Sequence, residues 1–148
     1  SAEEMYRVVM ENKNKADVII KCAAVADYTP VRVSRNKIKK GESFTLELKA
    51  TKDILSELGK GKKSVFLVGF AAETDHVLEY AKKKLKEKNL DIIVANDVSD
   101  TMTGFDSEDN AVSILHRDGR EANFGAASKE SIAGNILDEI QIGRNKGF

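Results

Sequence analysis

The sequence predicts an α/β fold in which an open, mainly parallel sheet carries helices on both faces and an antiparallel hairpin is appended. Three observations support this prediction. Apolar runs of strand length alternate with stretches whose apolar residues recur at helical spacing. The order of these stretches is βαβαβ, which is typical of a parallel sheet. Two short alternating runs then flank Asp118-Gly119, a strong hairpin signal, and a last helical stretch follows.

Composition predicts one globular domain over residues 1–148, because 41% of the residues are hydrophobic and 32% are charged. Basic and acidic residues number 24 each, so no net charge points to nucleic acid or to an acidic membrane surface. No apolar run approaches the roughly 20 residues of a membrane span. The single cysteine, Cys22, excludes an internal disulfide framework and indicates a cytoplasmic protein. We expect Cys22 to be a small buried hydrophobe.

The first predicted helix begins at Ser1, which has the capping-box spacing to Glu4. An apolar run over residues 16–20 then predicts a buried strand that ends near Ala24. Open parallel sheets bind ligands beyond the carboxyl ends of their strands, so Asp27 is expected at the edge of a site. The polar connection that follows carries three lysines whose charge could meet a phosphate. These are Lys37, Lys39 and Lys40.

The middle of the chain predicts a strand, a short helix and a second buried strand. Residues 43–48 alternate polar and apolar side chains, which indicates a half-buried strand. Thr51 is expected to cap a helix over residues 52–58, which Gly59 and Gly61 would end. The β-rich apolar run over residues 64–70 is the second buried strand.

A strongly amphipathic helix is predicted next, capped by Thr74 and running to about Lys88. Its expected core stripe is Leu78, Ala81 and Leu85. Asn89 would end the helix, residues 91–95 form a third apolar strand, and residues 99–110 form a loop.

The last part is predicted to be a hairpin and a helix. Residues 111–116 and 121–124 are its two strands, and Ser128 caps the helix. The inner face of that helix is expected to carry Ile132, Ile136, Leu137 and Ile140.

Six short motifs in this order resemble the phosphopantothenoylcysteine synthetase family. They are Ala-Ala-Val-Ala-Asp-Tyr-Thr-Pro at residues 23–30, Lys-x-Lys-Lys at 37–40, Gly-Phe-Ala-Ala-Glu-Thr at 69–74, the lysine-rich helix after it, Ala-Asn-Asp at 95–97, and Gly-Phe at 104–105. Each motif is weak alone, but together they cover nearly the whole chain. In bacteria the synthetase is usually the C-terminal half of a bifunctional coenzyme A biosynthesis flavoprotein.

The resemblance implies a Rossmann-like sheet and a ligase activity. Such enzymes join 4'-phosphopantothenate to L-cysteine through an acyl-cytidylate, using CTP and Mg²⁺. It also implies a homodimer, and FMN only in the fused decarboxylase half, outside this chain. A carboxylate becomes a good acyl donor as a nucleotidyl ester, and cations must stabilise the α-phosphate while pyrophosphate leaves. Lys37, the first lysine of Lys-x-Lys-Lys, matches the family position for this catalytic role.

Further positions match nucleotide contacts of the family. With Lys37, the set implied by the resemblance is Lys21, Cys22, Ala23, Asp27, Lys52, Asp53, Ile54, Leu55, Phe70, Lys84 and Lys88. No metal ligands are assigned, because His76 and His116 lack a ligand-like spacing.

The chain also departs from the family pattern. Many relatives carry Asn-Pro where this sequence has Thr51-Lys52. The family's glycine-rich phosphate loop, its Ser-Ser-Gly segment and an asparagine used for the intermediate are absent, so we expect the latter two-thirds of a synthetase domain. The missing segment or a fused decarboxylase domain would be a partner. The apolar residues of the 111–124 hairpin are expected to lie at a sheet or contact shared by two subunits.

Two other function classes stay open on the residues alone. A nicotinamide-dependent oxidoreductase fits the alternating α/β order, although no G-x-G-x-x-G follows a strand. A noncatalytic nucleotide-binding or assembly module also fits. In such a protein Lys37 would be a solvated lysine, Asp27 a turn cap and Phe70 a core residue.

Overall fold

A computed structural model describes residues 1–41, 43–73, 76–97 and 109–146. The expected cap Thr74, the Gly104-Phe105 motif and most of the expected loop over 99–110 lie outside these residues. No helix in the described ranges is long and apolar enough to cross a membrane.

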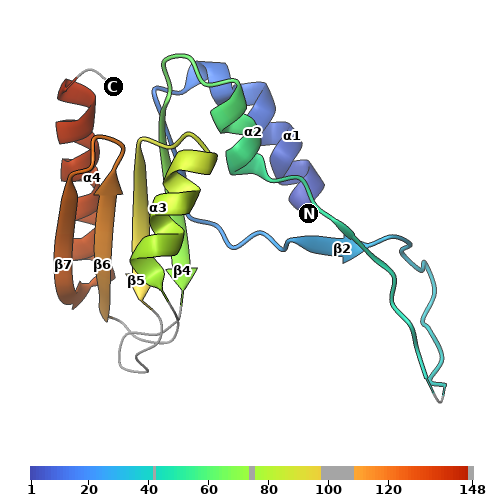
Figure 1. Cartoon of the computed structure of the whole chain (residues 1–148). Coiled ribbons are helices and arrows are strands. Elements are labelled where there is room, and N and C mark those ends of the chain that lie inside the picture. Colours follow the sequence, from blue (N-terminus) through green and yellow to red (C-terminus); the bar gives the residue numbers. More distant parts are fainter. Residues whose placement is uncertain (42, 74–75, 98–108, 147–148) are drawn as a thin grey trace.

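A five-stranded sheet in the order β1-β4-β5-β6-β7 forms the centre of the fold (Figure 1). The three strands β1 (Val18–Lys21), β4 (Phe66–Glu73) and β5 (Ile92–Asp97) are parallel. The hairpin strands β6 (Asp109–His116) and β7 (Glu121–Ser128) join β5 in antiparallel pairing. The predicted α/β class is therefore confirmed. The hairpin is an integral part of the sheet, so its strand partner β5 belongs to the same chain.

Helices cover both faces of this sheet, as predicted (Figure 1). They are α1 (Ala2–Asn12), the short 3₁₀ helix η1 (Lys13–Lys15), α2 (Ile54–Lys60), α3 (Val77–Glu87) and α4 (Lys129–Asn145). Leu67 and Ile93 pack on one face with residues of α2 and α3, whereas their neighbours Val68 and Ile92 pack on the other face with α4. This alternation follows from the two-residue period of a strand and places apolar side chains on both faces.

Several local signals are confirmed. Ser1 and Glu4 form both halves of the capping box, and the Ser128 hydroxyl accepts from the Ser131 amide. Gly119 has φ +89° in the hairpin turn, a conformation that costs glycine little. Asn89, just after α3, has φ +53°, as expected of a residue that ends a helix.

The predicted start of the second helix is wrong by two residues. Helix α2 is capped by Asp53, whose carboxylate accepts from the Ser56 amide at 3.0 Å. Thr51 instead donates its hydroxyl hydrogen to the carbonyl of Ala26 at 2.7 Å. Asp is at least as good a cap as Thr, and Thr51 is already engaged across the chain.

The predicted strand over residues 43–48 is also wrong. In the described residues of this region, β2 (Tyr28–Pro30) and β3 (Leu48–Ala50) pair as a separate antiparallel ladder, which contains Leu48 but not residues 43–47. Residues 31–41 and 43–47 form an arm that extends away from the main sheet (Figure 1). The alternation of residues 43–48 has no core to face there, so Phe44 and Leu46 are exposed.

Three burial predictions are wrong as well. Leu78 and Leu137 are 41% and 58% exposed, because α3 turns Val77, Ala81 and Leu85 to the core while α4 buries Ile132, Ile136 and Ile140. Cys22 is exposed, because β1 ends at Lys21 and the chain leaves the sheet.

Candidate nucleotide site

A small cavity lies where β1 ends, as expected for a ligand site of an open parallel sheet. Its volume is about 90 Å³. The lining residues are Lys21, Val25, Asp27, Thr51, Lys52, Asp53, Ile54 and Lys88. Six of them belong to the twelve positions predicted to contact a nucleotide. We call this cavity the β1 cavity.

Asp53 and Lys88 form the ion pair at the centre of the β1 cavity. One carboxylate oxygen of Asp53 caps α2, and the other lies 2.8 Å from the ammonium of Lys88 at the end of α3. Burial works to raise the pKa of Asp53, but its bonds to Lys88 and to the Ser56 amide, with the nearby charge of Lys21, hold that pKa below its ordinary value. Asp53 is therefore ionised at neutral pH and fixes the position of Lys88.

The loop after β1 is held against the segment before α2 by two hydrogen bonds from Thr51. Within the loop itself, Lys21 donates to the carbonyl of Ala23 at 3.0 Å. The Thr51 hydroxyl donates to Ala26, and the Thr51 amide donates to the carbonyl of Asp27 at 2.8 Å. The Asp27 backbone is thus fixed, while its side chain is exposed at the edge of the cavity.

The remaining lining positions differ in what they offer a ligand. The Lys52 ammonium lies 2.8 Å from Glu3 of α1 and 4.3 Å from the centre of the Tyr6 ring. Ile54 is buried and supplies an apolar wall. Leu55, also predicted to contact a nucleotide, is buried in the core and does not line the cavity.

Five other predicted positions lie outside the lining of the β1 cavity, four of them on or near the main sheet and the fifth, Lys37, on the arm. Cys22 and Ala23 are exposed on the loop that follows β1. Phe70 lies on β4 and is 37% exposed, so it is not a core residue. Lys84 lies on α3, one turn before Lys88, with its side chain partly buried.

The predicted catalytic residue, Lys37, lies on the exposed arm of residues 31–41 and 43–47 and does not line the cavity. Two lining residues, Val25 and Thr51, were missed as site residues. Thr51 carried a signal, since the chain departs from the family pattern there.

Neither histidine lies in the β1 cavity. His116 is buried, with Nε2 2.9 Å from Glu139 of α4 and Nδ1 3.0 Å from the guanidinium of Arg120. Burial and the positive charge of Arg120 lower the pKa of His116, against the opposing effect of Glu139. His76 is exposed next to Glu79.

Comparison with known proteins identifies the family. The family described as DNA/pantothenate metabolism flavoprotein C-terminal domain matches residues 1–142. This chain belongs to that family. The resemblance seen in the six motifs is thereby confirmed.

The similar proteins are longer than this chain. It is 48% identical over 141 residues to the coenzyme A biosynthesis bifunctional protein CoaBC of Bacillus subtilis and 39% identical over 145 residues to that of Escherichia coli. These alignments cover 95% of this chain but 35% and 36% of the two relatives. A crystal structure of the C-terminal domain of CoaBC superposes with a TM-score of 0.80 at 38% identity, covering 99% of this chain and 64% of that domain. This family member therefore spans about a third of its curated relatives and has the fold of their C-terminal domain.

Proposed function

We propose that this chain supplies the nucleotide-binding part of a ligase that joins 4'-phosphopantothenate to L-cysteine with CTP in coenzyme A biosynthesis. The observation that carries the proposal is the β1 cavity, which gathers six positions predicted from the family motifs. The names of the similar proteins, as coenzyme A biosynthesis bifunctional proteins, support the pathway.

The charges of the β1 cavity suit phosphate oxygens, and its volume of about 90 Å³ would hold part of a triphosphate. Lys21, Lys52 and Lys88 surround it with ammonium groups, which attract phosphate oxygens. Asp53 pairs with Lys88, and a phosphate oxygen of the nucleotide would take over part of that pairing. The exposed backbone groups around Ala23 and the half-exposed Phe70 would meet the base.

The proposed reaction has two steps. A carboxylate oxygen of 4'-phosphopantothenate attacks the α-phosphorus of CTP, pyrophosphate leaves, and an acyl-cytidylate forms. The cysteine amine then attacks the acyl carbon, CMP leaves, and the amide bond forms. Cations lower the barrier of the first step by stabilising the charge on the phosphate oxygens. Lys37 would perform this role when the arm brings it to the site, because its long side chain is exposed.

The donor set fits Mg²⁺ that arrives with the triphosphate. Magnesium in nucleotide sites is held by one or two carboxylates together with substrate phosphates. No group of three or more His, Cys, Asp or Glu side chains in the described residues could hold a metal alone. Asp27 is the lining carboxylate that is not paired with a lysine, and it would be the protein ligand. When bound, Mg²⁺ would neutralise phosphate charge.

Calorimetric titration with CTP, ATP and NAD tests the binding part of this proposal. We expect CTP to bind, and Lys88→Gln to weaken that binding by about tenfold or more, because one charge-assisted hydrogen bond is worth about 1.5–3 kcal/mol. Lys86→Gln is the matched control, since Lys86 is an exposed lysine of the same helix that does not line the β1 cavity. Binding of NAD in place of CTP would favour an oxidoreductase and overturn the proposal.

Pyrophosphate release with 4'-phosphopantothenate and L-cysteine tests the catalytic part. A chain without the family's glycine-rich loop and intermediate-binding asparagine is expected to bind CTP weakly and to form no product. Addition of a polypeptide that carries those elements should restore turnover. Robust turnover by this chain alone would show that the assignment of roles is wrong.

A further inference from the structure

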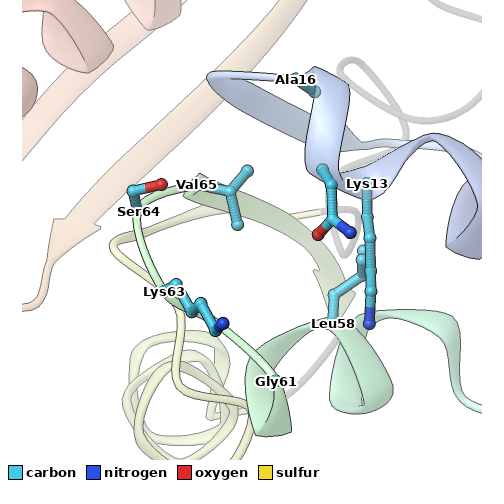
Figure 2. A pocket seen from close by; sticks show the side chains of 8 residues that line it. Lys13, Ala16, Leu58, Gly61, Lys63, Ser64 and Val65 are labelled. Atoms are coloured by element: carbon cyan, nitrogen blue, oxygen red, sulfur yellow. The ribbon is translucent and has the colours of Figure 1, made fainter.

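A second cavity lies at the opposite end of β1 from the β1 cavity. It is lined by residues that precede β1, end α2 and precede β4 (Figure 2). These are Lys13, Asn14, Ala16, Leu58, Gly61, Lys63, Ser64 and Val65. Its volume is about 330 Å³, which falls in the range of roughly 300–1,000 Å³ found for small-molecule pockets. Strand β1 has four residues, about 13 Å of chain, so the two cavities are separate.

The polar side chains of this second cavity have no hydrogen-bond or ion-pair partner within the described part of the chain. Lys13, Asn14, Lys63 and Ser64 make no ion pair or side-chain hydrogen bond there, whereas the neighbouring Lys62 is paired with Asp91. All four can donate hydrogen bonds, and two carry positive charge. No carboxylate lines the cavity. Its polar side is therefore suited to an oxyanion.

The other side of the cavity is apolar. Leu58 belongs to the core and is 2% exposed, while Ala16 and Val65 are partly buried. Figure 2 shows Leu58 and Val65 on the same open space as the side chains of Lys13 and Lys63. An inorganic anion would leave this apolar wall uncovered, but an organic anion with a short aliphatic part would cover it.

We propose that this cavity binds a small organic oxyanion, a phosphate monoester with a short aliphatic chain. The ammonium groups of Lys13 and Lys63 would hold the phosphate, with Asn14 and Ser64 as further donors. The aliphatic part would lie on Leu58 and Val65. Because this site shares no lining residue with the β1 cavity, its ligand would bind together with CTP.

Amide chemical shifts of the ¹⁵N-labelled chain, titrated with n-butyl phosphate, test the proposal. We expect saturable shifts at Gly61, Ser64 and Val65, and weaker binding of inorganic phosphate and of n-butanol, each of which offers only half of the recognition. Saturating CTP should leave the n-butyl phosphate affinity within about twofold, since the sites are separate. Whether CTP itself binds is a separate readout that tests only the proposed ligase function.

Two double variants separate a specific site from general positive charge. Lys13→Gln/Lys63→Gln should weaken n-butyl phosphate binding at least tenfold. Lys15→Gln/Lys60→Gln removes the same amount of charge. Lys15 and Lys60 are close in sequence to Lys13 and Lys63 but do not line the cavity, so this variant should change the affinity for n-butyl phosphate less than twofold. Unchanged melting curves would show that both variants fold. Equal weakening by both variants, competition with CTP, or absence of saturable binding would each overturn the proposal.

Discussion

Replacing Asp91 by alanine should strongly destabilise the fold. The Asp91 side chain, 2% exposed, lies just before β5 and connects three parts of the structure. Its Oδ2 accepts from the Leu67 amide of β4 at 2.7 Å and lies 2.5 Å from the ammonium of Lys62. Its Oδ1 lies 3.6 Å from the guanidinium of Arg117, beside the hairpin turn.

The magnitude follows from what alanine leaves behind. The Lys62 side chain is only 9% exposed, and burial lowers its pKa even with Asp91 beside it, which shows that the charged form is costly there. Removing one partner of a buried pair costs about 3–5 kcal/mol, and an unsatisfied buried amide costs about 1–3 kcal/mol. These costs overlap, because both come from desolvation around one carboxylate. We expect a loss of about 3–5 kcal/mol in the free energy of unfolding.

Urea denaturation measures this loss. With a slope of about 2 kcal/mol per molar, the midpoint should fall by about 2 M in Asp91→Ala. Lys62→Met removes the cation with little change in length, so Asp91→Ala/Lys62→Met should be more stable than Asp91→Ala, because no unpaired ammonium remains. A double-mutant cycle then gives the coupling energy. A loss below about 1 kcal/mol in Asp91→Ala would refute the reasoning.

Three further predictions concern catalysis, pH and assembly. In a preparation that turns over, Lys37→Ala should lower the rate of pyrophosphate release about 10²–10³-fold and leave the melting temperature unchanged, because this exposed lysine has little packing to lose. Burial keeps the folded-state pKa of His116 below its unfolded value of about 6.5, so the contribution of the neutral imidazole to the free energy of unfolding should be fully present above pH 6.5 and be lost as the pH falls below it. His116→Gln should flatten this pH dependence. A variant with the same slope as the wild type would show that another group causes the dependence. The exposed apolar arm is a candidate contact for the predicted homodimer, and Phe44→Glu should shift the mass from light scattering from dimer to monomer; a wild-type monomer at micromolar concentration would contradict this.

Elements with a strong local signal could be predicted from the sequence. The capping box at Ser1, the Asp-Gly turn with Gly119 at positive φ, and Asn89 after α3 depend only on neighbouring residues, and each is found where predicted. Apolar runs also located the three parallel strands, and for β4 and β5 this follows because a strand buried on both faces is continuously apolar. The prediction that β1 is buried is wrong, because β1 lies at the edge of the sheet, where Ile20 is 40% exposed.

Errors arose where a pattern has two solutions that only packing distinguishes. On α3, Leu78 and Val77 can each precede Ala81 at helical spacing, and contact with the sheet selects Val77. Alternation over residues 43–48 predicts a strand only if one face is covered, and the arm extends away from the core. The sequence contains no local signal for either choice.

The site residues whose positions could be predicted are those that lie at the ends of packed strands and helices. Lys21 ends a strand of the sheet, and Lys88 follows a helix whose Ala81 is fully buried, so the core fixes both positions. Their nearness in space could not be derived from spacing, and only the family resemblance placed them in one site. Lys37 lies on the arm, whose described residues are all exposed, so packing of these residues does not set its distance from the β1 cavity.

Asp53 connects the β1 cavity to two helices that are packed on the core. One of its oxygens caps α2, and that helix is anchored by Leu55 and Leu58 in the core. The other oxygen holds Lys88, so the end of α3 is tied to the start of α2 across the cavity. Gly59 allows this approach, because a β-carbon there would lie 2.0 Å from the backbone carbonyl oxygen of Lys88. The cation proposed to meet the triphosphate is thus positioned by two packed helices, which keeps the entropic cost of ordering it on ligand binding small.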